Sequence, residues 1–310
     1  MKLEKICIGC MREKDDGEAC PYCGMKAEEY QAQPRELPPL TVLQGKYLLG
    51  KVLGSGGFGI TYLALDLLLE RTVAIKEFFL EGYMFRDTRQ GPEIGIEHMT
   101  ARQMRLYRLN KARFESEARS MGRLEHLDGI VKVYDYFDEN LTSYLVMEYL
   151  SGVTLAKAVR RKTMTFHGAL ELLDGILLSL EELHRKGILH RDISPDNIML
   201  LEDGSARLFD FGGVKLLDQE SRERSEYVLM KGGFTPPEQL QSDTGQGPWT
   251  DVYAMSATIW FCISGRQPPR AGDRVCGSTQ LQKIRSGRGR ITGRQEAVLR
   301  RGMDLRPKYR

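Results

Sequence analysis

The sequence predicts an α+β protein with two lobes, a small β-rich lobe and then a large helical lobe, preceded by a small cysteine-rich module. Three observations support this prediction. Strand-like apolar runs cluster between Tyr47 and Leu150, and the apolar periodicity after Ser151 is mainly helical. Four cysteines lie close together near the N-terminus. At 310 residues, the chain is long enough for one two-lobed domain and a small appendage.

The N-terminal module, residues 1–32, contains two C-x2-C pairs. Two such pairs can wrap four thiolates around one Zn²⁺, and a site whose four positions are all filled by protein is structural. The segment has few apolar side chains, so metal binding would have to supply its folding free energy. Disulfides or a thiol redox pair are the alternative. The predicted ligands are Cys7, Cys10, Cys20 and Cys23.

A proline-rich linker is predicted over residues 33–44, because Pro34, Pro38 and Pro39 favour a stiff extended chain. The small lobe follows over 45–150. Its five predicted strands are the runs YLLGKVLG, ITYLALD, RTVAIKEFF, IVKVYDYF and SYLVMEYL.

A helix is predicted over residues 111–124, between the third and fourth strands, from apolar residues at helical spacing. The segment 78–113 has little periodicity, and we treat it as an insertion of uncertain structure. The large lobe, residues 151–310, has its clearest helical patterns at 169–184 and 252–264. The sequence stops soon after Arg306, so we expect the final helix of this lobe to be incomplete.

Composition excludes several classes of protein. A net charge of +3 is too small to indicate nucleic acid or a membrane surface as the main partner. No apolar run approaches the ~18 residues of a membrane span, and the first residues do not resemble a secretory signal. We therefore expect a cytoplasmic, reducing location, where cysteines are thiols or metal ligands.

A glycine-rich motif, G-x-G-x-x-G, is formed by Gly54, Gly56 and Gly59. Glycines at this spacing let backbone N–H groups approach phosphate oxygens closely. The strand-like run ITYLALD follows, whereas the dinucleotide-binding version of the motif opens a helix. An ordinary glycine-rich turn is the alternative interpretation.

Lys76 ends the β-branched run Val73-Ala74-Ile75-Lys76. A lysine at the end of a buried strand needs an anionic partner, because an unpaired ammonium is costly to bury. Glu117 is favoured over Glu115, since it stands three residues after Phe114 on the predicted helix. A solvated lysine on an edge strand is the alternative.

The most specific signal is HRDISPDN at residues 190–197, followed by Asp210-Phe211-Gly212. Both motifs resemble those of the protein kinase family. Their residues are similar to those of bacterial serine/threonine kinases that carry an N-terminal zinc ribbon. The resemblance implies a protein-kinase-like fold over about residues 45–310. It also implies that Asp192 orients or deprotonates the substrate hydroxyl, while Asn197 and Asp210 hold Mg²⁺ or Mn²⁺.

The same resemblance implies an ATP site and its supports. Met147 would stand beside the adenine as gatekeeper, and Met199 would form the apolar floor under the base. Asp251 would begin a helix that supports the catalytic loop, and Arg306 would pair with Glu238. The implied ATP-binding set is Gly54, Gly56, Gly59, Ala74, Lys76, Glu117, Met147, Glu148, Leu150 and Met199.

The predicted function is transfer of the γ-phosphoryl group of ATP to serine or threonine hydroxyls of protein substrates, and Pro195 favours these over tyrosine. Ser194 departs from the family, which usually has a lysine there that contacts the transferred phosphate. A pseudokinase or scaffold that binds nucleotide or partners without turnover is therefore the alternative. An adaptor role for the zinc module, with its own docking partner, is a third hypothesis. Phosphorylation of Ser221 or Ser225, read by Arg191, is the predicted regulation.

Overall fold

The computed structural model divides the chain into two compact units. Unit 1 comprises Met1–Glu125 and Lys132–Tyr149, and unit 2 comprises His126–Val131 and Leu150–Arg310. The structure describes residues 3–310 except Asp16, Gln90, Glu97, His98, Glu125, 212–214, 217–230, 241–244 and 285–290. Among the described residues, no helix combines the length and the apolar character needed to cross a bilayer.

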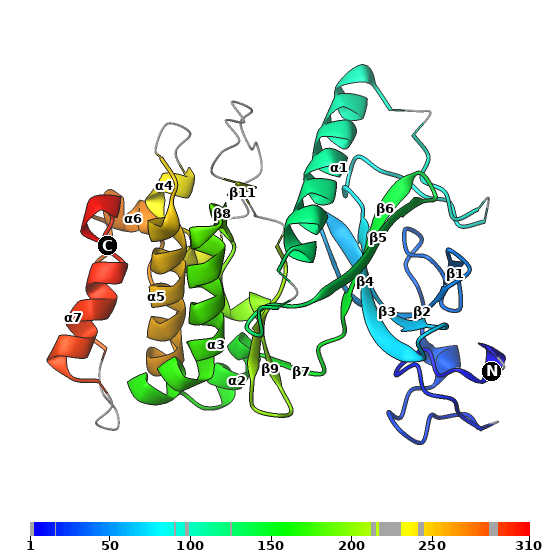
Figure 1. Ribbon diagram of the computed structural model, residues 1–310, viewed down its shortest axis with the longest axis horizontal. Helices are drawn as coiled ribbons and strands as arrows, with labels where there is room; N and C mark the ends of the chain where they lie inside the picture. The colour runs from blue at the N-terminus through cyan, green and yellow to red at the C-terminus, as the bar shows by residue number, and fades with distance from the viewer. Residues whose placement is uncertain are drawn as a thin grey trace. The chain divides into compact units, whose positions relative to one another are not determined.

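Unit 1 contains an antiparallel sheet of six strands in the order β1-β2-β3-β4-β6-β5 (Figure 1). The strands are β1 (Val42–Leu43), β2 (Tyr47–Gly56), β3 (Gly59–Asp66), β4 (Arg71–Phe78), β5 (Val133–Glu139) and β6 (Thr142–Glu148). Five of them confirm the predicted strands. The exception is β1, whose two residues pair with β2 inside the predicted linker and are too few to show alternation.

A 22-residue helix, α1 (Ala101–Gly122), packs on this sheet. It begins ten residues before the predicted helix, inside the segment whose structure was uncertain. Thr100 caps it: the Thr100 hydroxyl accepts the Gln103 N–H at 3.3 Å, and the Gln103 side chain accepts the Thr100 N–H at 2.9 Å. Further along, the Phe114 ring lies 5.7 Å from the ring of Phe78 on β4.

A buried ion pair joins the sheet to the chain segments around it. Successive strand residues face opposite sides of a sheet, so Lys76 and Glu77 on β4 point to opposite faces. Glu77 pairs with Arg86, and both side chains are fully buried. The hydroxyls of Tyr62 and Tyr144 each donate to Glu77 at 2.9 Å.

Arg86 also donates to two backbone carbonyls. It reaches that of Arg35 in the predicted linker at 2.8 Å and that of Pro92 at 2.7 Å. A buried pair whose hydrogen-bonding groups are satisfied avoids most of the cost of desolvation. The pair therefore connects the linker and the segment after β4 to three strands of the sheet.

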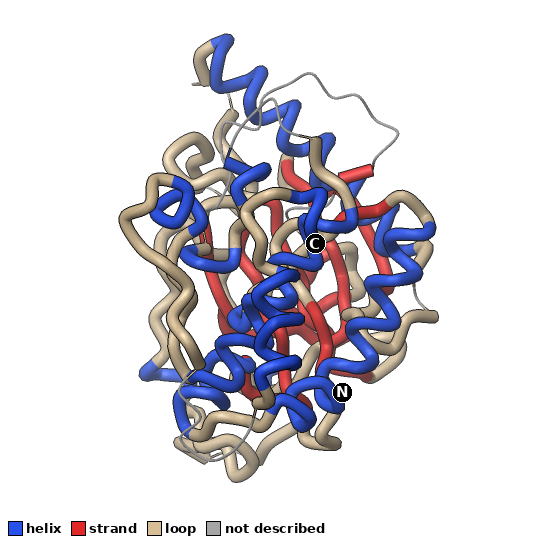
Figure 2. The backbone as a smooth tube through the Cα atoms, turned by 90° about the vertical axis from the view of Figure 1, so that its left-hand side faces the viewer, coloured by secondary structure: helices blue, strands red, loops and turns tan. Residues whose placement is uncertain are grey.

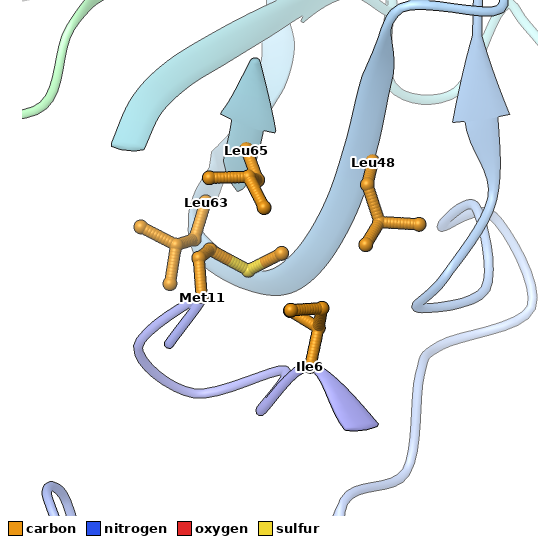
Figure 3. Packing of buried hydrophobic residues seen from close by; sticks show 5 residues of the cluster. All are labelled: Ile6, Met11, Leu48, Leu63 and Leu65. Carbon is orange, nitrogen blue, oxygen red and sulfur yellow. The ribbon is translucent and has the colours of Figure 1, made fainter. Parts of the chain in front are cut away.

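The N-terminal module packs on strands β2 and β3 of the same sheet. Ile6 and Met11 are buried, and Figure 3 shows both side chains pointing toward three leucines of β2 and β3. These leucines are Leu48, Leu63 and Leu65. Burial of a side chain of this size contributes about 1.5–3 kcal/mol to stability, so the contact of Ile6 and Met11 with the leucines stabilises the docked module.

Gly50 fixes how closely the module approaches β2. A Cβ at this position would lie 2.5 Å from the Met11 sulfur and 2.6 Å from the Ile8 carbonyl oxygen. The same Ile8 carbonyl accepts the N–H of Lys51 at 2.8 Å. The backbone of the first cysteine knuckle is thus hydrogen-bonded directly to the strand.

Helices form most of the regular structure in unit 2, and Figure 2 shows them in blue. They are α2 (Leu155–Arg161), α3 (Phe166–Arg185), α4 (Pro237–Leu240), α5 (Pro248–Ser264), α6 (Ala271–Val275) and α7 (Gly293–Gly302). Helices α3 and α5 confirm the two clearest helical predictions. Three short 3-10 turns also lie here: η3 (Pro195–Asn197), η4 (Gly232–Phe234) and η5 (Pro307–Tyr309).

Two small sheets complete unit 2, with strand orders β10-β9-β7 and β11-β8. The strands are β7 (Gly152–Thr154), β8 (Ile188–Leu189), β9 (Ile198–Leu201), β10 (Ala206–Leu208) and β11 (Lys215–Leu216). The β9–β10 hairpin connects the two most specific sequence motifs, HRDISPDN at residues 190–197 and the motif that begins at Asp210.

Candidate active site and metal site

The glycine-rich motif forms the hairpin between β2 and β3, where Gly56 pairs with Gly59. A Cβ at Gly54 or Gly56 would meet no atom within 4 Å, whereas one at Gly59 would lie 2.6 Å from the carbonyl oxygen of Glu77. Gly59 is therefore required for the close approach to β4. The first two glycines leave open space above the backbone, which fits a phosphate cradle.

Lys76 on β4 pairs with Glu117 on α1. The Lys76 Nζ lies 3.8 Å from Glu117 Oε1, and the two side chains are 15% and 10% exposed. Glu115 lies on a more exposed side of α1 and pairs with Arg119 instead. The helix thus presents Glu117 to the strand that carries the lysine.

The residues expected around adenine come from both units. In unit 1, Met147 on β6 stands opposite Ala74 on β4, and the N–H of Glu148 donates to the Lys132 carbonyl at 2.9 Å. In unit 2, Leu150 follows directly, and Met199 on β9 pairs with Thr154 on β7.

The loop of residues 190–197 in unit 2, the predicted catalytic loop, is anchored by Asp251 on α5. Its carboxylate accepts the backbone N–H groups of His190 at 2.9 Å and Arg191 at 2.8 Å. The same carboxylate lies 2.8 Å from Nε2 of His184 on α3. The prediction that the start of this helix supports the loop is confirmed.

Asp192 is held by two side chains that reach the same carboxylate oxygen. Asn197 Nδ2 and Lys231 Nζ each donate to Asp192 Oδ2 at 2.8 Å. Burial raises the pKa of Asp192, and the positive charge of Lys231 opposes this effect. The amide nitrogen of Asn197 is occupied by Asp192, so its amide oxygen is the atom left to bind a cation.

The β9–β10 hairpin brings Asp210 next to this loop. The N–H of Phe209 donates to the Asn197 carbonyl at 2.9 Å, and Asp210 is the next residue. Asp210 has a φ of 64°, an uncommon backbone conformation for a residue other than glycine. Phe211 is buried against His190, with the ring centroids 4.4 Å apart. Gly212, Ser221 and Ser225 lie outside the described residues.

His190 is itself fully buried. Burial lowers its pKa from 6.5 to about 4, although the carboxylates of Asp251 and Asp210 favour the protonated ring. Its Nδ1 accepts the N–H of Asp192 at 3.3 Å. A neutral histidine therefore supports the backbone at Asp192.

The predicted pairing of Arg306 with Glu238 is wrong. Glu238 instead forms an ion pair with Arg310, and Arg310 Nη2 lies 3.0 Å from Glu238 Oε2. Arg306 is largely exposed and lies 3.6 Å from Asp304. The turn η5 opens at Pro307, directly after Arg306, and returns the chain so that Arg310, not Arg306, reaches the glutamate.

The four N-terminal cysteine sulfurs lie within 4.8 Å of one another. The Cys7–Cys23 and Cys10–Cys20 sulfur pairs are each 3.7 Å apart. Zinc–sulfur bonds of about 2.3 Å in a tetrahedron place the sulfurs about 3.8 Å apart. The Gly9 N–H also donates to the Cys7 sulfur at 3.3 Å. Both the spacing and the donor set fit one tetrahedral zinc ion.

Several residues near the site were not identified from the sequence. No sequence pattern indicated a role for Lys231, apart from the presence of Ser194 where the family usually has a lysine. In unit 1, the Tyr30 hydroxyl accepts the Val52 N–H on β2 at 2.9 Å. Arg35 donates to the hydroxyl of Ser55, inside the glycine-rich motif, at 2.9 Å. No local pattern distinguishes such long-range contacts from solvated side chains.

Comparisons with known proteins agree with these motifs. The protein kinase domain family matches residues 47–287. Serine/threonine-protein kinase PknL of Mycobacterium tuberculosis is 30% identical over 239 residues, which cover 77% of this chain and 54% of PknL. Serine/threonine-protein kinase PknA of a Nostoc species is 32% identical over 238 residues, 73% of this chain and 38% of PknA.

A solved structure, the apo form of PpkA-294, is similar over most of its length. Its TM-score is 0.73 at 30% sequence identity, and the match covers 89% of this chain and 95% of that chain. The chain spans only 54% and 38% of the two curated relatives above, so it is similar to one part of each. With the family match extending over residues 47–287 and the motifs in their expected elements, the chain belongs to the protein kinase family.

Proposed function

We propose that this protein is an ATP-dependent protein kinase that transfers the γ-phosphoryl group to serine or threonine hydroxyls of protein substrates. The observation that carries the proposal is the arrangement at Asp192. Its carboxylate accepts hydrogen bonds from Asn197 and Lys231, and its loop is anchored by Asp251. The names of the relatives support the same substrate class.

In the proposed reaction, the substrate hydroxyl oxygen bonds to the γ-phosphorus as the bond to the β,γ-bridging oxygen breaks, and ADP leaves. Asp192 orients the hydroxyl and accepts its proton. In unit 1, the N–H groups around Gly54, Gly56 and Gly59 bind phosphate oxygens. Lys76, held by Glu117, binds the phosphates as well.

The amide oxygen of Asn197 and the carboxylate of Asp210 would hold Mg²⁺ or Mn²⁺, hard cations that prefer oxygen ligands. Such an ion neutralises charge on the nucleotide phosphates. The adenine would contact Ala74, Met147 and Met199, with backbone contacts at Glu148 and Leu150. These assignments follow from strand register in each unit and from the family motifs.

We also propose that Cys7, Cys10, Cys20 and Cys23 bind one structural Zn²⁺ in a module of residues 1–32, followed by a linker (33–44), a small lobe (45–150) and a large lobe (151–310). The sulfur spacing supports the metal, and the packing of Ile6 and Met11 supports a structural role. Thiolate ligands suit a reducing compartment, so we propose a cytoplasmic location. The face of the module away from β2 and β3 could receive a docking partner.

The test is phosphate incorporation from labelled ATP with Mg²⁺ into a serine/threonine protein substrate. Asp192→Ala should lower the rate by about 10²–10⁴-fold, the usual contribution of a general base. Asp203→Ala is the matched control, because Asp203 is exposed and bonds only its neighbour Ser205 among the described residues. Equal rates in wild type and Asp192→Ala would refute the proposal. Nucleotide binding without transfer would establish the non-catalytic alternative, which nothing in the fold or the relatives favours.

A further inference from the structure

Ser194 cannot supply the positive charge that most serine/threonine kinases place at this position of the catalytic loop. Its side chain is fully buried, and among the described residues its hydroxyl has no hydrogen-bond partner. Its carbonyl is used locally and accepts the N–H of Asn197 at 3.0 Å. The loop residues themselves therefore bring no lysine to Asp192.

Lys231 brings a lysine ammonium to Asp192 from 39 residues further along the chain. Its Nζ lies 2.8 Å from Asp192 Oδ2, and the side chains of Lys231 and Asp192 are 25% and 14% exposed. At this distance and with this burial, the pair is screened far less than a surface ion pair. The ammonium adjoins the oxygen that Asn197 also holds.

The backbone around Lys231 is fixed by local hydrogen bonds. The Lys231 N–H donates to the hydroxyl of Thr235 at 3.0 Å, and the Lys231 carbonyl accepts the N–H of Phe234 at 3.0 Å. These two bonds close the turn η4. The ammonium is thus presented by an ordered turn rather than by an exposed side chain on a free loop.

That turn is also anchored to the helical part of unit 2. A Cβ on Gly233 would lie 2.0 Å from the carbonyl oxygen of Pro268, so the turn packs directly on the segment after α5. The Phe234 ring meets the ring of Phe261 on α5 edge-on, with centroids 6.1 Å apart. Helix α5 therefore positions both Asp251, which holds the catalytic loop, and the turn that carries Lys231.

We propose that Lys231 is a relocated positioning residue, which fixes the Asp192 carboxylate and supplies beside it the positive charge that a lysine at position 194 supplies in most serine/threonine kinases. This inference rests on the proposed kinase function. During transfer, negative charge spreads over the oxygens of the moving phosphoryl group, and a preorganised cation stabilises that charge. The positive charge that is absent at Ser194 is then supplied by Lys231 instead of being lost.

The experiment measures kcat and KM for ATP in four variants: Lys231→Ala, Lys231→Arg, Lys231→Ala combined with Ser194→Lys, and Lys283→Ala. Lys231→Ala should lower kcat by about 100-fold, as loss of one preorganised charge does in other enzymes. Its KM for ATP should stay within about threefold of wild type, because the lysine contacts Asp192 rather than a nucleotide-binding residue. Lys283 is exposed, and Lys283→Ala should behave as wild type.

Rescue separates positioning from simple structural support. Lys231→Arg and the combined Lys231→Ala, Ser194→Lys variant should each recover at least about tenfold in kcat, with melting temperatures that identify any variant that has not folded. Equal kcat in wild type and Lys231→Ala would overturn the inference. Equal inactivity of all three Lys231 variants would also overturn it, since a purely structural lysine gives that pattern. An inactive wild type with intact nucleotide binding would instead refute the proposed function.

Discussion

The guanidinium of Arg310 pairs with the carboxylate of Glu238, and both side chains are almost completely buried. Arg310 also stacks over the ring of Tyr253 at 4.9 Å, while Thr250 donates to Glu238 at 3.2 Å. The last residue of the chain therefore contributes to the core of unit 2. Breaking such a pair leaves an uncompensated buried charge.

Arg310→Ala should lower the free energy of unfolding by about 3–5 kcal/mol, because Glu238 would stay buried without its partner. Urea unfolding measures this change. Arg306→Ala, four residues earlier and largely exposed, is the matched control and should change stability by less than about 0.5 kcal/mol. Similar losses in both variants would contradict the assignment of Arg310 as the partner of Glu238.

Glu117→Gln should reduce kcat/KM for ATP by about 100-fold, because Lys76 loses its ionic partner and a small displacement of a phosphate-binding group is costly. Steady-state kinetics with varied ATP measure this effect. Glu115→Gln is the control on the same helix, since Glu115 pairs with Arg119. If the two variants lose activity equally, the Lys76–Glu117 pair does not position the lysine.

Acid should destabilise the protein through His190. Its pKa in the folded protein, about 4, lies below the ordinary value of 6.5. Between these two pH values, the histidine is protonated in the unfolded chain but neutral in the folded protein. This contribution to stability is complete above pH 6.5 and declines as the pH falls toward 4, by about 3 kcal/mol in total.

Urea unfolding at a series of pH values tests this contribution. His190→Gln should reduce the slope of stability against pH in that window, whereas His167→Gln, at an exposed position, should preserve the slope. Ring NMR signals of wild-type His190 should not titrate above about pH 5. A His190 ring that titrates near its ordinary pKa would refute the prediction.

Zinc removal should destabilise unit 1. The protein should contain one zinc per chain by elemental analysis, and a chelator or Cys20→Ser should lower the melting temperature by about 5 °C or more. The reason is that Ile6 and Met11 lose the folded module that holds them on the sheet. Cys276→Ser, at an exposed cysteine far along the chain, should have no such effect. Unchanged stability after complete loss of metal would contradict a structural zinc.

The parts of the fold that were predicted correctly are those with local signals. The β4 run ending at Lys76 is apolar and rich in β-branched residues, and α3 and α5 have long apolar patterns. The first three turns of α1 were missed because their few apolar residues are interspersed with arginines and other polar residues, and among 101–113 only Tyr107 is buried. The Thr100–Gln103 capping box was visible in the sequence, but the irregular spacing of the apolar residues after it did not indicate a helix.

The contacts that escaped prediction depend on closure of the chain over long separations. Lys231 and Asp192 are 39 residues apart, and Arg310 and Glu238 are 72 apart. Whether a charged residue meets such a partner is decided by turns such as η4 and η5, whose directions depend on packing. Arg306 matched the family pattern by its position in the sequence. The turn η5, which begins at Pro307, instead brings Arg310 to Glu238.

The docking of the cysteine module onto β2 and β3 bears on how the protein can be divided. A fragment limited to residues 47–287, the region that matches the family, would lack both Ile6 and Met11 and would leave Leu48 and Leu63 uncovered. It would also lack Arg310, whose guanidinium pairs with the buried carboxylate of Glu238. Trimming the protein to the region that matches the family would therefore expose apolar surface on β2 and β3 and remove a buried ion pair. A loss of activity in such a fragment would not bear on the activity proposed for the whole chain.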